Sequence, residues 1–477
     1  MSHLDAINFA SLNDQMTLLN DVQSQLNQTI VSRVQRPSSP KEVRILLNKA
    51  RSAGESVCPA GALHSMGGQQ FLTKGVSLSS DGLDSIGPLD EESKTVTVQS
   101  GVRWPELVRW LRNEQCENPR HLTIIQKQTG ADALSLGGAL SSNIHSRVLG
   151  RKPIVEDIES FYITTSDGSR VKCSREENSE LFQCAIGGYG LFGFVDSINL
   201  KLTERQQLKR EVTENSLEEV IPLLENYADR GATYGDFQYM TDEDSQDFLS
   251  KGILSVYIPT FAETDSVSRC NELTIDDWKR LFVLAHTNKK IAYHEYLTHY
   301  MKTDGQLYWS DDHQFSPYLP EAGALLSREL GWTTPRSLMI TELYVPRSKF
   351  VDFMKNAKKI LKETEANLVY GTVRLIEREN ETFLRWASQD FACVIFNLLV
   401  EHSSEGKNKA SYQFQMLIDC ALNEGGSFYL TYHRWARKDQ VEAAYPQFKE
   451  FLERKDHWDP VHLFRSDWYS HYATLFA

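Results

Sequence analysis

Small residues surround a single histidine in the stretch PAGALHSMGGQ, residues 59–69. A loop of glycine and alanine lets backbone N–H groups approach a ligand closely, and concave sets of such groups commonly bind phosphate. His64, in the middle of the loop, would either contact that ligand or hold the turn in place. The composition of the loop therefore predicts a binding surface made largely of backbone.

Two further glycine-rich stretches follow, GADALSLGGALSSNIHS at residues 130–146 and IGGYGLFGF at residues 186–194. The second contains GYGLFG, which fits the GxGxxG fingerprint of nicotinamide-binding Rossmann folds. That fingerprint runs from a strand into a helix, whereas here a predicted helix precedes the glycines and a predicted strand follows them. We therefore reject a Rossmann site. Two interpretations of the glycines remain: a turn that lets a ligand approach closely, and a turn with no ligand.

The histidine and cysteine patterns give weaker evidence of function. The histidines of HEYLTH, His294 and His299, are five residues apart, which places them about 140° apart on a helix instead of on the single face that a zinc helix needs. We expect a solvated helix there and no metal site. The seven cysteines stand singly without a CxxC pair, which favours reduced thiols in a cytoplasmic setting.

Composition limits the class of protein. The chain has 477 residues, 41% of them apolar and 24% charged, with a formal net charge of −13. Such an acidic chain is not expected to bind nucleic acid or an anionic membrane surface. We find no apolar run long enough for a membrane span, and the first fifteen residues lack the pattern of a signal peptide.

The predicted elements fall into two blocks and a tail. The first block mixes strands (30–37, 193–204), helices (39–54, from about Pro105, 177–187) and a hairpin (158–174). The second has longer strand candidates (337–346, 367–377, 391–402, 410–419) separated by helices such as 348–364, which predicts an antiparallel sheet covered by helices on one face. We place the domains at 1–205 and 206–430, with a C-terminal segment, 431–477, packing back on the first.

Taken together, in this order and spacing, the three glycine loops resemble the vanillyl-alcohol-oxidase superfamily with its PCMH-type FAD-binding domain. Within it, the chain is similar to the aldonolactone and alditol oxidases and to the decaprenylphosphoryl-ribose oxidase group. The resemblance implies an α+β, two-domain fold with an antiparallel-sheet substrate domain covered by helices, and FAD as cofactor. An acidic chain would have to neutralise the FAD pyrophosphate largely through backbone N–H groups, which the glycine loops supply.

The resemblance also implies which residues bind the cofactor. His64 stands where related oxidases carry a histidine bonded covalently to the flavin, so a covalent bond is expected, with a non-covalent contact as the alternative. Ala131 occupies the position of the cysteine in doubly linked relatives, which argues against a second bond. The expected FAD contacts are Pro59, Ala60, Gly61, Ala62, Leu63, His64, Ser65, Met66, Gly67, Gln69, Gly130, Ser135, Leu136, Gly137, Gly138, Ser142, Asn143, His145, Val195 and Tyr429.

On the substrate side, the resemblance matches single residues of this chain to functional residues of the related enzymes. Arg374 matches an arginine of the sugar-lactone group, but Thr372 replaces its glutamate. Glu342 and Asn397 stand where relatives have a substrate-lining glutamine and a histidine. Tyr432 or His433 matches a catalytic lysine. The catalytic candidates are thus Arg374, Tyr432, His433, Glu342 and Asn397.

Consecutive residues of a strand face opposite ways, so Tyr432 and His433 cannot both face the flavin. Tyr308, Trp309 and His313 are candidates for a substrate lid.

The implied activity is an FAD-dependent oxidoreductase, an oxidase or a dehydrogenase. It would take a hydride from a CH–OH carbon of a polyol, sugar, lactone or related small molecule onto flavin N5. The alternatives are oxidation of a C–N or activated C–H bond in secondary metabolism, and a non-catalytic flavin-binding partner protein. The expected partners are a small-molecule substrate and an electron acceptor, oxygen or an unidentified carrier. Substrate identity and oligomeric state stay open.

Overall fold

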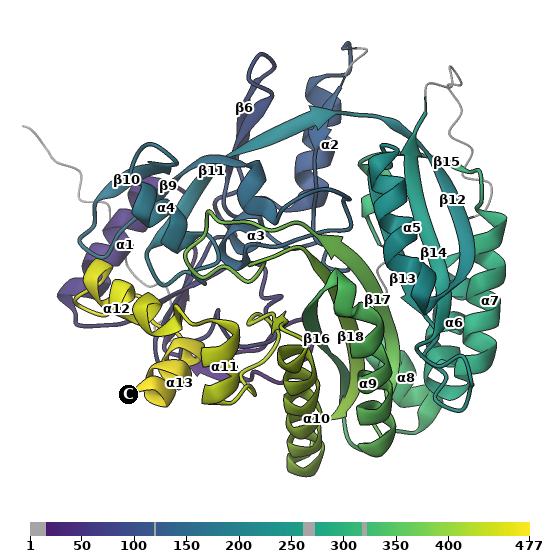
Figure 1. The fold of residues 1–477 in the computed structure, drawn as a ribbon. Coiled ribbons are helices and arrows are strands. Elements are labelled where there is room, and N and C mark those ends of the chain that lie inside the picture. Colours follow the sequence, from purple (N-terminus) through teal and green to yellow (C-terminus); the bar gives the residue numbers. More distant parts are fainter. Residues whose placement is uncertain (1–15, 119–120, 261–271, 317–321) are drawn as a thin grey trace, which may run out of the picture.

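The computed structural model describes residues 16–118, 121–260, 272–316 and 322–477. Cys270 and the first fifteen residues lie outside these ranges. In the described part, helices and antiparallel sheets follow one another along the chain, so the α+β class is confirmed (Figure 1).

The first block contains a parallel sheet ordered β3-β5-β4 and an antiparallel sheet ordered β10-β9-β11-β7-β6, to which β8 adds by pairing with β11. Ser39 accepts a hydrogen bond from the N–H of Glu42 and Pro40 opens the first helix, as the sequence pattern predicts. The elements are β1 (Thr17–Leu19), β2 (Thr29–Val31), β3 (Arg33–Gln35), α1 (Pro40–Ser52), β4 (Val57–Ala60), β5 (Val76–Ser79), β6 (Ile86–Asp90), β7 (Thr95–Gln99), α2 (Trp104–Glu114), β8 (Leu122–Ile124), α3 (Leu136–Ser142), β9 (Ile158–Thr164), β10 (Arg170–Ser174), α4 (Ser179–Ala185) and β11 (Phe194–Glu204).

The second block is built on an antiparallel sheet ordered β15-β12-β14-β13-β17-β18-β16-β19. Helices α5, α9 and α10 pack on one face of this sheet (Figure 1). The elements are β12 (Gln207–Ser216), α5 (Leu217–Asp229), β13 (Tyr234–Tyr239), β14 (Lys251–Pro259), α6 (Ile275–Thr287), α7 (Lys289–Lys302), β15 (Leu307–Trp309), α8 (Ala322–Leu330), β16 (Arg336–Pro346), α9 (Phe350–Glu363), β17 (Leu368–Ile376), β18 (Phe391–Glu401) and α10 (Ser404–Asn423).

Three details differ from the sequence prediction. Residues 410–419, predicted as a strand, lie inside α10, where the buried residues Ala410, Phe414, Leu417 and Ala421 recur at helical spacing. Helix α7 also reaches the second face of the sheet, because its Tyr300 contacts Arg210 and Gln238 on that face. The stretch 425–438, treated above as a strand in placing Tyr432 and His433, pairs only at Ser427–Phe428, as β19, so the alternation of a strand does not apply to residues 429–438.

The C-terminal segment continues with α11 (Lys438–Ala444), α12 (Phe448–Trp458) and α13 (Asp467–Phe476). Its backbone returns to the first block, because Val57 and Leu463 form a hydrogen bond of 2.7 Å and Asp467 donates to the carbonyl of Phe71. The largest core cluster contains residues of both blocks and of this segment. The glycine loops therefore lie where all three parts of the chain meet.

Candidate active site

A cleft of about 650 Å³ of empty space, partly open to solvent, lies among the three glycine loops. All three loops contribute to its wall, as the sequence pattern predicts. The predicted residues that line it are Pro59, Ala60, Gly61, Ala62, Leu63, His64, Ser65, Gln69, Gly137, Gly138, Ser142 and Val195. Residues that sequence reasoning missed are Gln70, Ser80, Ser100, Leu134, Ser141, Tyr189, Gly190, Gly193 and Phe194.

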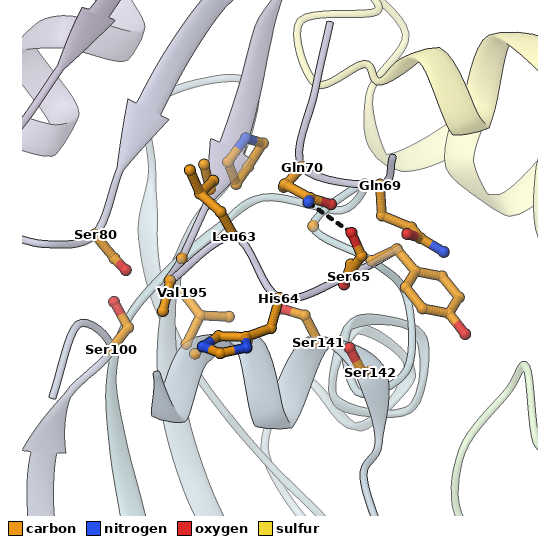
Figure 2. A pocket seen from close by; sticks show the side chains of 18 of the residues that line it. Leu63, His64, Ser65, Gln69, Gln70, Ser80, Ser100, Ser141, Ser142 and Val195 are labelled. Carbon is orange, nitrogen blue, oxygen red and sulfur yellow. Dashed lines mark hydrogen bonds between the residues drawn. The ribbon is translucent and has the colours of Figure 1, made fainter. Parts of the chain in front are cut away.

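The backbone of the first loop is unusually free to bind a ligand. In the described part of the chain, the N–H groups of the five residues 62–66 donate to no acceptor. Leu63 adopts a left-handed backbone conformation with φ of 59°, and Leu63 and His64 project to opposite sides of the loop (Figure 2). Consecutive free N–H groups in such a turn form the concave site that a pyrophosphate needs.

Side chains on the opposite wall add to this cradle. The hydroxyls of Ser80 and Ser100 point toward each other on this wall (Figure 2), and both are buried without a hydrogen-bond partner among the described residues. A Cβ added to Gly137 would lie 2.8 Å from Cβ of Ser100, so this wall is already closely packed. Unpaired hydroxyls and free N–H groups around one cleft fit a phosphate-rich cofactor.

His64 lines the cleft as a neutral imidazole. Burial, with the charge of Arg103, lowers its pKa to about 4. Its Nδ1 lies 2.8 Å from the amide nitrogen of Gln23, which comes from the segment before β2. The ring is therefore uncharged at neutral pH. Its Nδ1 is held by Gln23, so Nε2 is the nitrogen left to contact a ligand.

The remaining predicted cofactor residues do not line the cleft; several of them are bonded to residues that do. Ser135 caps α3 through the N–H of Gly138, and Asn143 ends the helix in a left-handed conformation. Gly67 donates to the carbonyl of Thr431, and the Tyr429 hydroxyl donates to the carbonyl of Ser142 at 2.5 Å. Others are Met66, which is buried, Gly130, which lies in a turn, Leu136, which begins α3, and His145, which follows it.

A second group of polar side chains lies next to the cleft, around Glu342. Its Oε1 accepts a hydrogen bond from the Tyr432 hydroxyl at 2.9 Å, and its Oε2 accepts one from Tyr344 at 3.0 Å. Nε2 of His145 lies 2.8 Å from the same Oε2. The ring of Tyr429 packs against that of Tyr432, and its hydroxyl donates to the carbonyl of Ser142 in the cleft wall. The group around Glu342 therefore adjoins the cofactor cleft.

Electrostatics keep the carboxylate of this group ionised. Burial alone would raise the pKa of Glu342, but His145, Arg374 and the Tyr432 hydroxyl together lower it. Burial and the charge of Glu342 raise the pKa of Tyr432 well above its ordinary value. The pair at rest is therefore a tyrosine hydroxyl donating to a carboxylate.

The adjacent candidates His433 and Tyr432 lie in different surroundings. His433 packs among the rings of Phe414, Phe428 and Trp435 on the Thr341 side, and burial lowers its pKa to about 3. Tyr432, in contrast, turns toward Glu342.

Arg374 lies buried on the sheet face that also carries Glu342, and Asn397 lies on that face opposite Tyr370. The predicted lid, Tyr308–His313, is instead an edge strand, β15, and a short 3-10 helix. Asp311 anchors this segment through ion pairs with Arg112 and Arg205.

The comparison with known sequence families decides the nature of the cleft. Residues 31–174, which contain the first two glycine loops, match the family described as FAD binding domain. This segment is an FAD-binding domain. The free N–H groups of residues 62–66 and the unpaired hydroxyls of Ser80 and Ser100 all lie within this segment. The predicted resemblance to the PCMH-type FAD-binding superfamily is confirmed for this part of the chain.

Curated relatives match between 36% and 40% of the chain. The chain is 30% identical over 172 residues to the mitochondrial L-galactono-1,4-lactone dehydrogenase 2 of Oryza sativa, which covers 36% of this chain and 27% of the relative. It is 23% identical over 192 residues to the L-gulonolactone oxidase of Bos taurus, covering 40% and 42%. It is 26% identical over 187 residues to the D-arabinono-1,4-lactone oxidase of Debaryomyces hansenii, covering 36% and 32%. The match thus spans less than half the length of each relative.

The described residues include no helix both long and apolar enough to cross a membrane. His294 and His299 of the HEYLTH stretch lie on α7.

Proposed function

We propose that the protein is an FAD-dependent oxidoreductase that takes a hydride from a CH–OH carbon of a polyol, sugar, lactone or related small molecule. The observation that carries this proposal is the hydrogen-bonded chain Tyr432–Glu342–His145 beside the FAD cleft. The names of the relatives, which refer to sugar-lactone dehydrogenases and oxidases, support the substrate class. Oxygen or an unidentified carrier would be the electron acceptor.

The residues divide the work as follows. Tyr432 accepts the proton of the substrate hydroxyl while its own proton moves to Oε1 of Glu342. His145 and Tyr344 hold Oε2 of that carboxylate in place. Bound FAD supplies the hydride acceptor. Arg374, a buried cation on the same sheet face, stabilises negative charge that develops on the substrate oxygen.

We also propose that residues 1–205 form the FAD domain and 206–430 the substrate domain, with 431–477 returning to the first. The hydrogen bond between Val57 of the first block and Leu463 of the C-terminal segment supports the return of that segment to the FAD domain. The PCMH-type two-domain arrangement follows from the same proposal.

Anaerobic reduction of the flavin tests the function. We expect at least one polyol, sugar lactone or glycosyl phosphate to bleach the yellow protein. Tyr432→Phe keeps the ring but loses the hydroxyl, so bleaching should slow by about a hundredfold. Tyr412→Phe, at an exposed tyrosine of α10, is the control and should keep the wild-type rate. Bleaching by amines alone would indicate oxidation of a C–N bond, and bleaching by nothing would indicate a non-catalytic flavin-binding protein.

Covalent attachment at His64 is a separate prediction. A neutral, desolvated imidazole is the form that can bond to carbon. The pellet from acid precipitation should stay yellow, and mass spectrometry should find the FAD mass on the peptide that contains His64. The His64→Ala protein should bind FAD yet give a colourless pellet. A colourless wild-type pellet would refute the bond and leave the FAD site intact.

A further inference from the structure

The sheet face that carries Glu342 on β16 continues to β12, and its part on the four strands β17, β13, β14 and β12 is a polar surface. Residues directly opposite each other on paired strands share a face. By this register Arg210 of β12 lies beside Tyr257 of β14, and Asp236 of β13 lies beside Ser255 of β14. Phe237 pairs with Val373, so the next residues along, Asp236 and Arg374, come together on the face opposite that pair. This surface, from Arg210 to Arg374, we name the polar face.

Unpaired polar atoms concentrate on the polar face and the loop above it. Among the described residues, buried side-chain atoms without a hydrogen-bond partner include Arg147 Nε, Arg210 Nη2, Gln238 Oε1, His313 Nε2, Thr372 Oγ1 and Arg374 Nε. The other notable concentration of such atoms is in the FAD cleft, at Gln69, Gln70, Ser80 and Ser100. Buried polar groups are normally paired, so both concentrations indicate a place where a ligand completes the hydrogen bonds.

Most of these atoms are donors. Arg147 Nη2 can only donate, so Nδ1 of His313, 3.0 Å away, accepts, and Nε2 of His313 carries the proton. Burial and the nearby arginines lower the pKa of His313 well below its ordinary value, which keeps it in this neutral form. Four of the six unpaired atoms are therefore N–H donors. A ligand that satisfies them must be rich in acceptors.

Positive charge on the polar face also exceeds negative charge. Arg147 is paired with Asp236 at 3.1 Å. Among the described residues, Arg210 and Arg374 form an ion pair with no carboxylate, although both are at least nine-tenths buried. Arg210 instead bonds Ser255 and lies over the ring of Tyr300, 4.0 Å from its centre. The ionised Glu342 lies within electrostatic reach of Arg374, whereas in the described part of the chain Arg210 has no such carboxylate. A buried cation without an anion is costly, and an incoming anionic group would offset that cost at Arg210.

The surface opens to solvent at Tyr370. Its side chain is 42% exposed, although its hydroxyl lies within electrostatic reach of Arg147, Arg374, Asp236 and Tyr300. The hydroxyl itself is buried, and burial raises its pKa, so an anionic group entering past the exposed part of the ring would reach the hydroxyl and the arginines together.

We propose that the polar face is a subsite for an anionic group, a carboxylate or a phosphate, carried by a polyhydroxylated substrate. The Tyr370 hydroxyl contacts the anion, and Arg147 and Arg210 supply the positive field. Gln238 and Thr372 bind substrate hydroxyls. This inference rests on the proposed function, whose substrate class it narrows from neutral sugars and lactones to sugar acids or sugar phosphates.

Equilibrium binding to the FAD-loaded protein tests the subsite without any turnover. Isothermal titration with glucitol, gluconate and glucitol 6-phosphate compares one carbon chain in neutral, carboxylate and phosphate form. We expect at least one anion to bind about tenfold or more tightly than glucitol, a difference of about 1.4 kcal/mol. The preferred anion identifies the group. Equal affinity for all three ligands would overturn the inference.

Variants localise the effect. Tyr370→Phe, at an exposed position, and Arg210→Gln should each reduce the advantage of the anion over glucitol by about fivefold or more. Arg336→Gln, a partly exposed arginine of the same sheet paired with Glu401, is the matched control and should keep that advantage. If Arg210→Gln fails to fold, as judged by FAD content, Tyr370→Phe decides. An advantage unchanged in Tyr370→Phe overturns the subsite.

The two proposals fail in different ways. If neutral polyols bleach the flavin but anions bind no more tightly, only the subsite is wrong. If anions bind tightly but no compound bleaches the flavin, the proposed oxidation is wrong and the binding site stands.

Discussion

Replacing Arg374 with alanine should lower the rate of flavin reduction by about a hundredfold or more with the best substrate found. Arg374 is buried on the sheet face beside Glu342, and no ion pair with another described residue ties up its charge. In such a site a fixed cation stabilises charge that develops during the reaction more than it stabilises the bound substrate. The loss should therefore fall on kcat more than on KM.

Lysine and control variants sharpen this result. Arg374→Lys should recover only part of the rate, because an ammonium cannot reproduce the planar fork of a guanidinium. Arg336→Ala, on the same sheet but partly exposed, should reduce flavin at the wild-type rate. Stopped-flow absorbance under anaerobic conditions measures all three. A wild-type rate for Arg374→Ala would place the residue outside the reaction and refute the proposed site.

Leucine in place of Gly138 should abolish FAD retention while the chain still folds. A Cβ at Gly138 would lie 3.2 Å from its nearest neighbours, Leu134 and Ser135, whereas one at Gly61 would lie 2.3 Å from the Ser135 hydroxyl. The protein can therefore accommodate a side chain at Gly138 with small shifts, but Gly138 lines the cleft in which we propose that FAD binds, so that side chain would compete with the cofactor for space. The purified variant should be colourless.

The melting temperature separates lost binding from lost folding. Gly138→Leu should melt like wild-type protein stripped of FAD, and added FAD should no longer raise its melting temperature. Gly323→Leu, at an exposed position of α8 with open space around it, should stay yellow. A yellow Gly138→Leu protein would contradict the assignment of the cleft.

The FAD loops could be predicted from the sequence because their composition is dictated by local backbone needs. Glycine and alanine at residues 59–69 are unusual in a folded chain, and their order with the two later loops is specific. Ser80 and Ser100 could not be predicted, since a serine after a strand is common and only the fold brings these two side by side on the wall of the cleft.

The substrate side was harder to predict, because it too depends on residues that only the fold brings together. The polar face depends on register between strands that lie far apart in the sequence, such as Phe237 with Val373. Strand existence was predictable for residues 337–346, 367–377 and 391–402, whose β-branched and apolar residues are typical of buried strands. Residues 410–419 were assigned to the wrong element because a short apolar run fits both periods.

The hydrogen bonds between the first FAD loop and residues 430–431 bear on the order in which the protein is assembled during synthesis. Gly67 and the side chain of Gln69 bind the carbonyls of Leu430 and Thr431, so the loop is clamped by residues near the end of the chain. Domains generally fold from the N-terminus as the ribosome releases them, yet this loop can only be fixed once those late residues emerge. We therefore expect the loop to take its final form only after residues 430–431, some 361 positions further along the chain, have been made.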